Sequence, residues 1–208
     1  MKKLVIFLLL SLMAMPVAEA KRRETAEEIE RKTRNYEGWE WGVSGRLGLV
    51  FYEMNHTHIK GQDPMTAYKT LVKMGGNAMI GGGYLINNHW RVGFEAGGQF
   101  QYNYVAVPIY ATGHYFYGTR KNCLFNFVNL GTNVLFDKGL RFGGLGAAGV
   151  GVRLQGPESD HKIDIMIGYQ TTLFSPRPVL NPPYSFDKSD VSRIALSQSV
   201  FIGVSYMF

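Results

Sequence analysis

The chain has 208 residues, a formal net charge of +6 and a single cysteine, Cys123. This length suits one domain once any targeting segment is removed, and a lone cysteine excludes an intramolecular disulfide. The lysines and arginines are scattered among aromatic and glycine residues, so the positive charge does not predict a nucleic-acid partner.

The first 20 residues have the layout of a secretory signal peptide. Two lysines precede the apolar run 4–13, and the small residues that end at Ala20 supply a cleavage site. Pro16 interrupts the apolar stretch, whereas a transmembrane helix needs about 20 unbroken apolar residues. We therefore predict export and cleavage after Ala20.

Residues 21–38 differ in composition from the rest of the chain. Thr25 and Glu28 form a capping box, and charged pairs such as Glu27/Arg31 are spaced four residues apart. Apolar residues are too sparse to make a packing face. The segment predicts a short polar helix that leads into the main domain.

From Trp39 onward the hydrophobic pattern changes to period two. In 39–52 an apolar row alternates with a row that carries the charges, and 90–102, 162–173 and 194–208 repeat the pattern. Such alternation over about 9–11 residues is typical of strands that span a bilayer. Glycine blurs the alternation in four further segments, which are 73–86, 104–117, 122–136 and 140–154.

Connector lengths agree with an even number of strands. The short connectors 87–89, 118–121 and 156–160 fall at one end, and the long connectors 54–72 and 175–193 fall at the other. Membrane barrels have short turns on the periplasmic side and longer loops outside. We predict an all-β fold over 39–208, an eight-stranded antiparallel transmembrane β-barrel preceded by the short polar helix.

Aromatic residues at both ends of the predicted strands favour a membrane barrel over its alternative, a soluble β-sandwich, which also alternates. The predicted periplasmic rim contains Trp39, Trp41, Tyr84, Trp90, Tyr115, Tyr117, Tyr206 and Phe208, and the outer rim contains Phe51, Phe100, Tyr102, Tyr104, Phe136 and Phe174.

Charged residues on the inward row predict a polar network. The interior of an eight-stranded barrel is just wide enough for side chains to fill it, and an unpaired buried charge is costly. We therefore expect the charges to pair and to block water, with a narrow polar conduit as the alternative. The predicted network consists of Arg46, Arg91, Glu95, Arg141, Arg153, Lys162 and Asp164.

Two motifs invite a chemical interpretation that their context does not support. The glycine pattern at 144–149 fits a dinucleotide loop, but strand-like residues follow it where a helix would be needed. His56 and His58 lack a partner at a metal-site spacing, so we expect loop histidines. The sequence predicts no catalytic residue, no cofactor and no metal.

The end of the chain resembles the C-terminal signal of outer-membrane barrels, with Gly203, Tyr206 and Phe208 at the matching positions. Phe201 departs from the pattern, which usually has a polar residue there. The layout of 39–208 is similar to the OmpX/OmpA-transmembrane type of small barrel, a porin-like architecture. The resemblance implies a Gram-negative outer membrane, recognition by the barrel assembly machinery, and contact with outer-membrane lipid and lipopolysaccharide. We expect a monomer.

These patterns predict a noncatalytic outer-membrane barrel whose extracellular loops contact a surface or envelope component. Four prolines stiffen the last loop, where Tyr184 and Phe186 are the contact candidates. One alternative is a lipid A-modifying acyltransferase, with His56 or His58 as base. Another is a narrow channel for small solutes.

Overall fold

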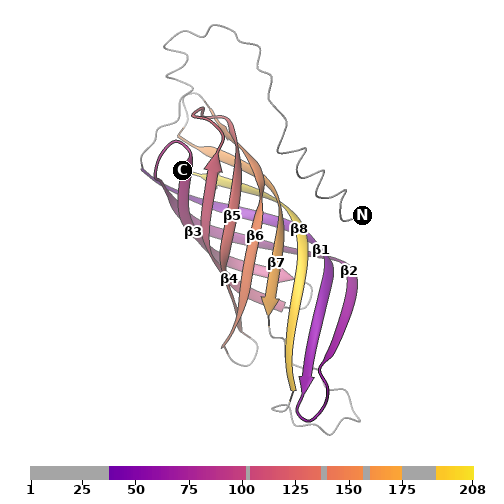
Figure 1. Ribbon diagram of the computed structural model, residues 1–208. Coiled ribbons are helices and arrows are strands. Elements are labelled where there is room, and N and C mark those ends of the chain that lie inside the picture. The colour runs from indigo at the N-terminus through magenta and orange to yellow at the C-terminus, as the bar shows by residue number, and fades with distance from the viewer. Residues whose placement is uncertain (1–37, 102–103, 137–139, 157–159, 175–190) are drawn as a thin grey trace, which may run out of the picture. The chain divides into compact units, whose positions relative to one another are not determined.

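A computed structural model describes residues 38–101, 104–136, 140–156, 160–174 and 191–208. Each strand pairs antiparallel with the next, and the last strand pairs with the first, so the sheet closes into a barrel (Figure 1). The predicted eight-stranded barrel is confirmed. The predicted signal peptide and polar helix lie outside the described residues. The strands are β1 Gly38–Ile59, β2 Met65–Leu85, β3 Trp90–Gln101, β4 Tyr104–Phe116, β5 Cys123–Phe136, β6 Leu140–Gln155, β7 Lys162–Phe174 and β8 Val191–Met207.

The wall of the barrel has an apolar outside and a polar inside. On β1, Leu47 is 63% exposed while its neighbour Arg46 is 3% exposed, and β3, β7 and β8 alternate as predicted. Closure leaves no sheet edge unpaired around the barrel, which is the condition for a sheet to cross lipid. The two-layer sandwich alternative is therefore wrong. Within these ranges no helix has the length and apolar character to cross a membrane.

The two ends of the described chain meet at one end of the barrel. The backbone NH of Trp41 donates to the carbonyl of Phe208 at 3.2 Å, and the NH of Phe208 donates to the carbonyl of Trp41 at 2.8 Å. At the same end, the side-chain oxygen of Asn87 accepts from the backbone NH groups of His89 and Trp90 and so closes the β2–β3 turn. Because it holds the C-terminus, we call this end periplasmic.

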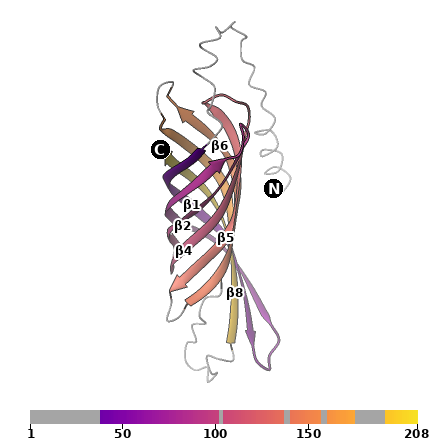
Figure 2. The same ribbon diagram turned by 90° about the vertical axis from the view of Figure 1, so that its left-hand side faces the viewer.

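At the other end, the predicted connector 54–72 is wrong. β1 continues to Ile59 and β2 begins at Met65, and β8 pairs with β1 as far as Val191. The neighbouring strands β3 and β7 stop earlier, so 52–59, 65–72 and 191–194 form a three-stranded sheet beyond the barrel (Figure 2). We call this sheet the extension. Of the other predicted long connector, 191–193 belongs to β8, and 175–190 lies outside the described residues.

A shift of register marks the point where the extension leaves the barrel. It falls between Val50 and Tyr52 on both sides of β1. β-Bulges of this kind bend a strand and increase its twist. The extension retains the pairing of the barrel strands but follows its own direction (Figure 2).

Aromatic side chains line the outside of the periplasmic end, as predicted. Trp39 packs against Tyr84 with ring centroids 5.6 Å apart, and Trp90 packs against Tyr115 at 5.0 Å. At the outer end Phe51 and Phe100 face outward. The predicted position of Phe174 is wrong, because its ring is 7% exposed and packs inside the barrel. Tyr102 lies outside the described residues, as do the side chains of Tyr104 and Phe136.

Candidate functional site

The structure places six of the seven predicted lumenal charges inside the barrel. The buried members are Arg46, Arg91, Glu95, Arg153 and Asp164, and Lys162 lies at the rim. The side chain of Arg141 lies outside the described residues. The charges form two groups, one at the periplasmic end and one about mid-barrel.

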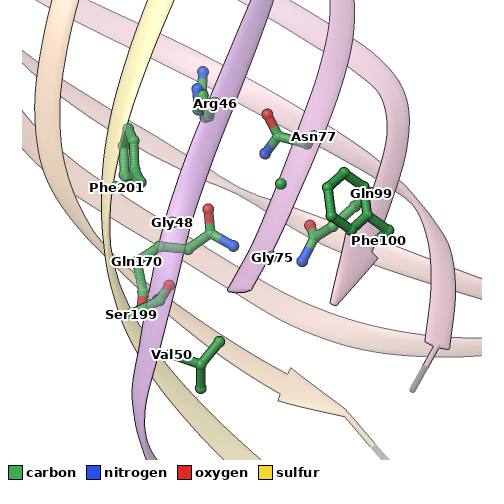
Figure 3. A pocket seen from close by; sticks show the side chains of 11 residues that line it. Arg46, Gly48, Val50, Gly75, Asn77, Gln99, Phe100, Gln170, Ser199 and Phe201 are labelled. Atoms are coloured by element: carbon green, nitrogen blue, oxygen red, sulfur yellow. Dashed lines mark hydrogen bonds between the residues drawn. The ribbon is translucent and has the colours of Figure 1, made fainter. Parts of the chain in front are cut away.

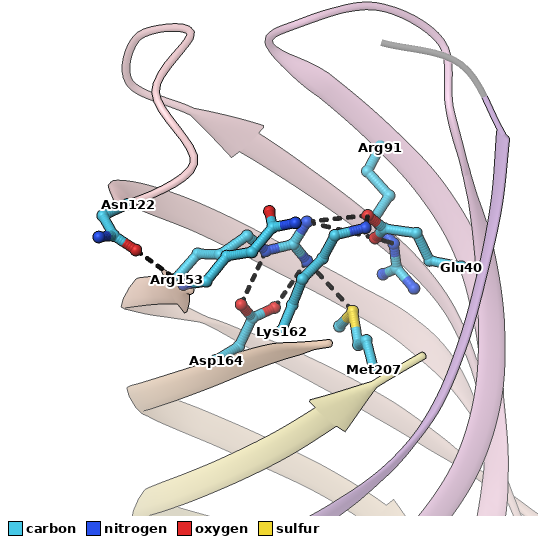
Figure 4. A network of polar contacts seen from close by, with 8 residues as sticks. Glu40, Arg91, Asn122, Arg153, Lys162, Asp164 and Met207 are labelled. Atoms are coloured by element: carbon cyan, nitrogen blue, oxygen red, sulfur yellow. Dashed lines mark hydrogen bonds and ion pairs between the residues drawn. The ribbon is translucent and has the colours of Figure 1, made fainter. Parts of the chain in front are cut away.

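Arg153 is the centre of the periplasmic group (Figure 4). Its Nε and Nη2 donate to the two carboxylate oxygens of Asp164, both at 2.8 Å. Both side chains are fully buried. The guanidinium also lies over the ring of Phe116, 4.5 Å from its centroid, and Nη2 contacts Sδ of Met207 at 3.1 Å. This bidentate geometry holds Arg153 in a single orientation.

Glu40 joins the remaining cations to Arg153 (Figure 4). Its carboxylate contacts Lys162 Nζ at 2.6 Å, Arg91 Nε at 3.0 Å and Arg153 Nη1 at 3.2 Å. We call Glu40, Arg91, Arg153, Lys162 and Asp164 the plug. Its members come from β1, β3, β6 and β7, so one buried network ties together strands from all around the wall.

The predicted network omitted Glu40, although the signal was present in the sequence. Glu40 stands between Trp39 and Trp41, and the alternation of that strand points its side chain inward. An acidic residue was needed to balance the predicted excess of arginines. The requirement that buried charges pair could therefore have identified it.

The second group is an ion pair between Arg46 and Glu95. Arg46 also lies over the rings of Tyr110 and Phe201, at 5.3 and 5.5 Å from their centroids. Such cation–π contacts are strongest where water is excluded. The middle of the lumen is therefore filled by paired charge and aromatic rings.

Glycines on the wall provide the space for these rings. A methyl group at Gly149 would lie 2.7 Å from the ring of Phe127, and one at Gly151 would lie 2.4 Å from the ring of Phe125. Gly149 ends the glycine pattern at 144–149, and the whole pattern lies within β6. As predicted, it is part of a strand, and its one inward glycine, Gly149, accommodates the aromatic filling.

The outer end of the lumen is narrowed by an apolar cluster. Ala106, Leu135, Phe174 and Ala195 pack together there, and all four are buried. The cluster draws on β4, β5, β7 and β8.

The two predicted histidines lie on the outer side. His56 belongs to the extension rather than to a loop, and its Nδ1 lies 2.9 Å from the hydroxyl of Thr66. No group of three or more potential metal ligands occurs in the described ranges. The contact candidates Tyr184 and Phe186 lie outside those ranges.

The barrel meets the physical requirements of a membrane protein. Its apolar exterior and aromatic rim suit contact with lipid, and its charge-paired interior suits a lumen filled by side chains. The chain has the architecture of a small membrane-spanning β-barrel. No protein-family model and no curated protein matches its sequence. The barrel is similar to the outer membrane protein OprG from Pseudomonas aeruginosa, at 13% identity and a TM-score of 0.48, covering 84% of this chain and 98% of OprG.

Two further solved barrels are similar to this one. Neisserial surface protein A is 15% identical with a TM-score of 0.33, covering 78% of this chain and 95% of its own. A de novo designed transmembrane β-barrel is 12% identical with a TM-score of 0.36, covering 85% and 99%.

Proposed function

We propose that this outer-membrane barrel is a noncatalytic and nonconducting scaffold that holds a contact surface outside the membrane. The observation that carries the proposal is the combination of a filled lumen and an extended outer edge. The plug crosses the periplasmic end from Glu40 to Asp164, and an apolar cluster narrows the outer end. A fold used for conduction would need a continuous polar path between these two ends.

The extension provides the contact surface. Tyr68 and Val72 are 67% and 83% exposed, and the rings of Tyr52 and Tyr68 lie 6.3 Å apart on one face. Exposed aromatic residues with a polar edge are enriched where proteins bind partners. Tyr184 and Phe186, in the connection that follows β7, are the further contact candidates. The partner is a surface or envelope component.

The route to the membrane follows from the termini. The signal peptide is cleaved after Ala20, residues 21–37 form a polar helix and lead-in in the periplasm before β1, and the monomeric barrel inserts among outer-membrane lipid and lipopolysaccharide. The assembly machinery recognises Gly203, Tyr206 and Phe208. In support, Tyr206 and Phe208 present their rings on the outside of the last strand, with centroids 6.5 Å apart.

Conductance in planar bilayers tests the nonconducting part of the proposal. The purified barrel is expected to give no single-channel steps, with a known porin as positive control. Reproducible single-channel steps from the folded protein would contradict the scaffold function and support a narrow channel instead.

Lipid analysis tests the noncatalytic part. Mass spectra of lipid A from cells with and without the protein are expected to be the same. A new acyl chain that depends on His56 or His58 would instead establish the acyltransferase alternative.

Site-specific photo-crosslinking in intact cells tests the contact surface. A photoreactive residue at Tyr68 is expected to give a discrete adduct, whereas one at Ile80, which faces lipid on the same strand and is 63% exposed, should label lipid only. The same lipid labelling from both positions would contradict a contact role for the extension.

A further inference from the structure

A pocket in the outer half of the lumen lies beneath the extension (Figure 3). Its empty volume is about 300 Å³ with the open mouth included, and the centre of a water molecule can reach about 20 Å³ of it. This space can hold one water or one hydroxyl group, since a water needs roughly 10–15 Å³ measured in this way. The pocket can therefore take up the edge of a ligand whose remainder lies in the mouth.

One wall of the pocket is polar but carries no unbalanced charge. Asn77, Gln99, Gln170 and Ser199 line it together with Arg46. The guanidinium of Arg46 is already paired with Glu95. Primary amides and hydroxyls both donate and accept hydrogen bonds, so this wall suits a neutral ligand with hydroxyl groups better than an ion.

Two polar atoms of this wall lack a hydrogen-bond partner among the described residues. They are Oδ1 of Asn77, an acceptor, and Nε of Arg46, a donor, and both side chains are more than nine-tenths buried. A buried polar atom left without a hydrogen bond is unfavourable, so a ligand that pairs with it gains affinity. A ligand hydroxyl can satisfy an acceptor and a donor at the same time.

Next to these polar side chains the lumenal lining is apolar. It consists of Val50 and the backbones of Gly48 and Gly75, where no side chain fills the space, whereas Phe100 and Gly76 belong to the outward rows of their strands. A ligand that fits this lining has hydroxyl groups along its edge and CH groups on its face. We propose that the pocket binds one unit of an uncharged saccharide.

The extension gives the rest of a longer saccharide a polar surface to follow. Arg193 donates to Oδ1 of Asn55 at 2.6 Å, and Asn55 donates to Glu53 at 2.8 Å. Asn55 pairs with the buried Ala195, and residues opposite each other in a sheet share a face, so this chain of contacts lies on the lumenal face. The pocket and the extension share the strands β1, β2 and β8.

Saturation-transfer NMR on the barrel in lipid nanodiscs tests the proposal, with maltoside detergents avoided because they are sugars themselves. Glucose, galactose and N-acetylglucosamine are one set of probes, and the delipidated core oligosaccharide of lipopolysaccharide is the other. A dissociation constant on the order of 1 mM is expected for one sugar unit. Tighter binding of the oligosaccharide would identify lipopolysaccharide sugars as the source, and equal binding would indicate free sugars.

Two matched variants show whether the saccharide binds in the pocket or elsewhere in the lumen. Asn77→Leu is expected to weaken binding at least tenfold. Asn133→Leu should leave binding unchanged, because Asn133 is an equally buried and unpartnered amide that does not line the pocket. Heat-modifiable migration checks that each variant is folded, and Asn77→Ala replaces Asn77→Leu if the larger side chain prevents folding.

No saturation transfer to any saccharide at 100 times the expected dissociation constant, on the order of 100 mM, would overturn the proposal. Equal weakening by the two variants would do the same, as would a response to chloride or phosphate in place of sugars. These outcomes leave the surface-contact function intact, because that function depends on the outward side of the extension.

Discussion

Replacing Arg153 by methionine removes the centre of the plug and leaves Asp164 as a fully buried carboxylate. Arg153 supplies both hydrogen bonds of this carboxylate, each at 2.8 Å. Glu40 keeps Lys162 at 2.6 Å and Arg91 at 3.0 Å, so the penalty falls on Asp164. Breaking one partner of a buried ion pair typically costs about 3–5 kcal/mol, and we expect Arg153→Met to lower the free energy of unfolding by about this amount.

The double variant Arg153→Met/Asp164→Leu distinguishes this reasoning from a simple loss of packing. It removes the stranded carboxylate, and exchanging a buried ion pair for apolar residues is often close to neutral. We expect the double variant to recover at least about 2 kcal/mol of the loss. Lys69→Met on the exposed edge of the extension serves as the control, since exposed charges contribute little.

Equilibrium denaturant unfolding in phospholipid vesicles, followed by tryptophan emission, measures these free energies. The three tryptophans lie at the periplasmic rim, near the plug. The reasoning is refuted if Arg153→Met stays within about 1 kcal/mol of the wild type, or if the double variant is less stable than the single one.

Three further predictions concern the wall and its ends. Gly149→Ala should destabilise the barrel by about 1–3 kcal/mol in the same unfolding assay, because the added methyl group overlaps Phe127 and the backbone. Gly146→Ala should be nearly neutral. Equal effects of the two substitutions would contradict the role of Gly149 in making space for the ring. Phe208→Ala should reduce the fraction of heat-modifiable barrel recovered in a pulse-chase experiment, and Phe208→Tyr should not; normal assembly of the alanine variant would remove Phe208 from the insertion signal. Cys123 is buried, so it should react with a maleimide only after denaturation, and rapid labelling of the native protein would count against its position.

The barrel wall was predictable because lipid and lumen place opposite demands on neighbouring residues. In β1, apolar Leu47 alternates with charged Arg46, and this contrast identifies both the strand and its register. The extension offers no such contrast, since His56 and Thr66 face one side while Asn55 and Glu53 face the other. Its strands are stabilised by backbone pairing between polar segments, which hydrophobic alternation does not report.

The sequence predicts that charged side chains fill the lumen, but it predicts only part of how they pair. Alternation assigns charged residues to the lumen, but it does not show which strands bring them together. The placement of Arg153 between Asp164 and Glu40 depends on barrel closure, because Glu40 is 113 residues away in sequence. Phe174 follows the outward Leu173, so strict alternation predicts the inward position that the structure shows. The prediction placed Phe174 at the rim because it is aromatic, and the alternation of the strand is the better guide to its position.

The long ladder between the first and last strands has a consequence for folding. Joining β1 to β8 closes a loop of nearly the whole domain, which is the contact with the largest entropy cost. The ladder runs from Gly42 opposite Met207 to Ile59 opposite Val191, well past the end of β7. We expect the contacts between β1 and β8 to form last in assembly and to be among the most numerous. Separation of these two strands should then be slow, which gives the inserted barrel a long kinetic lifetime.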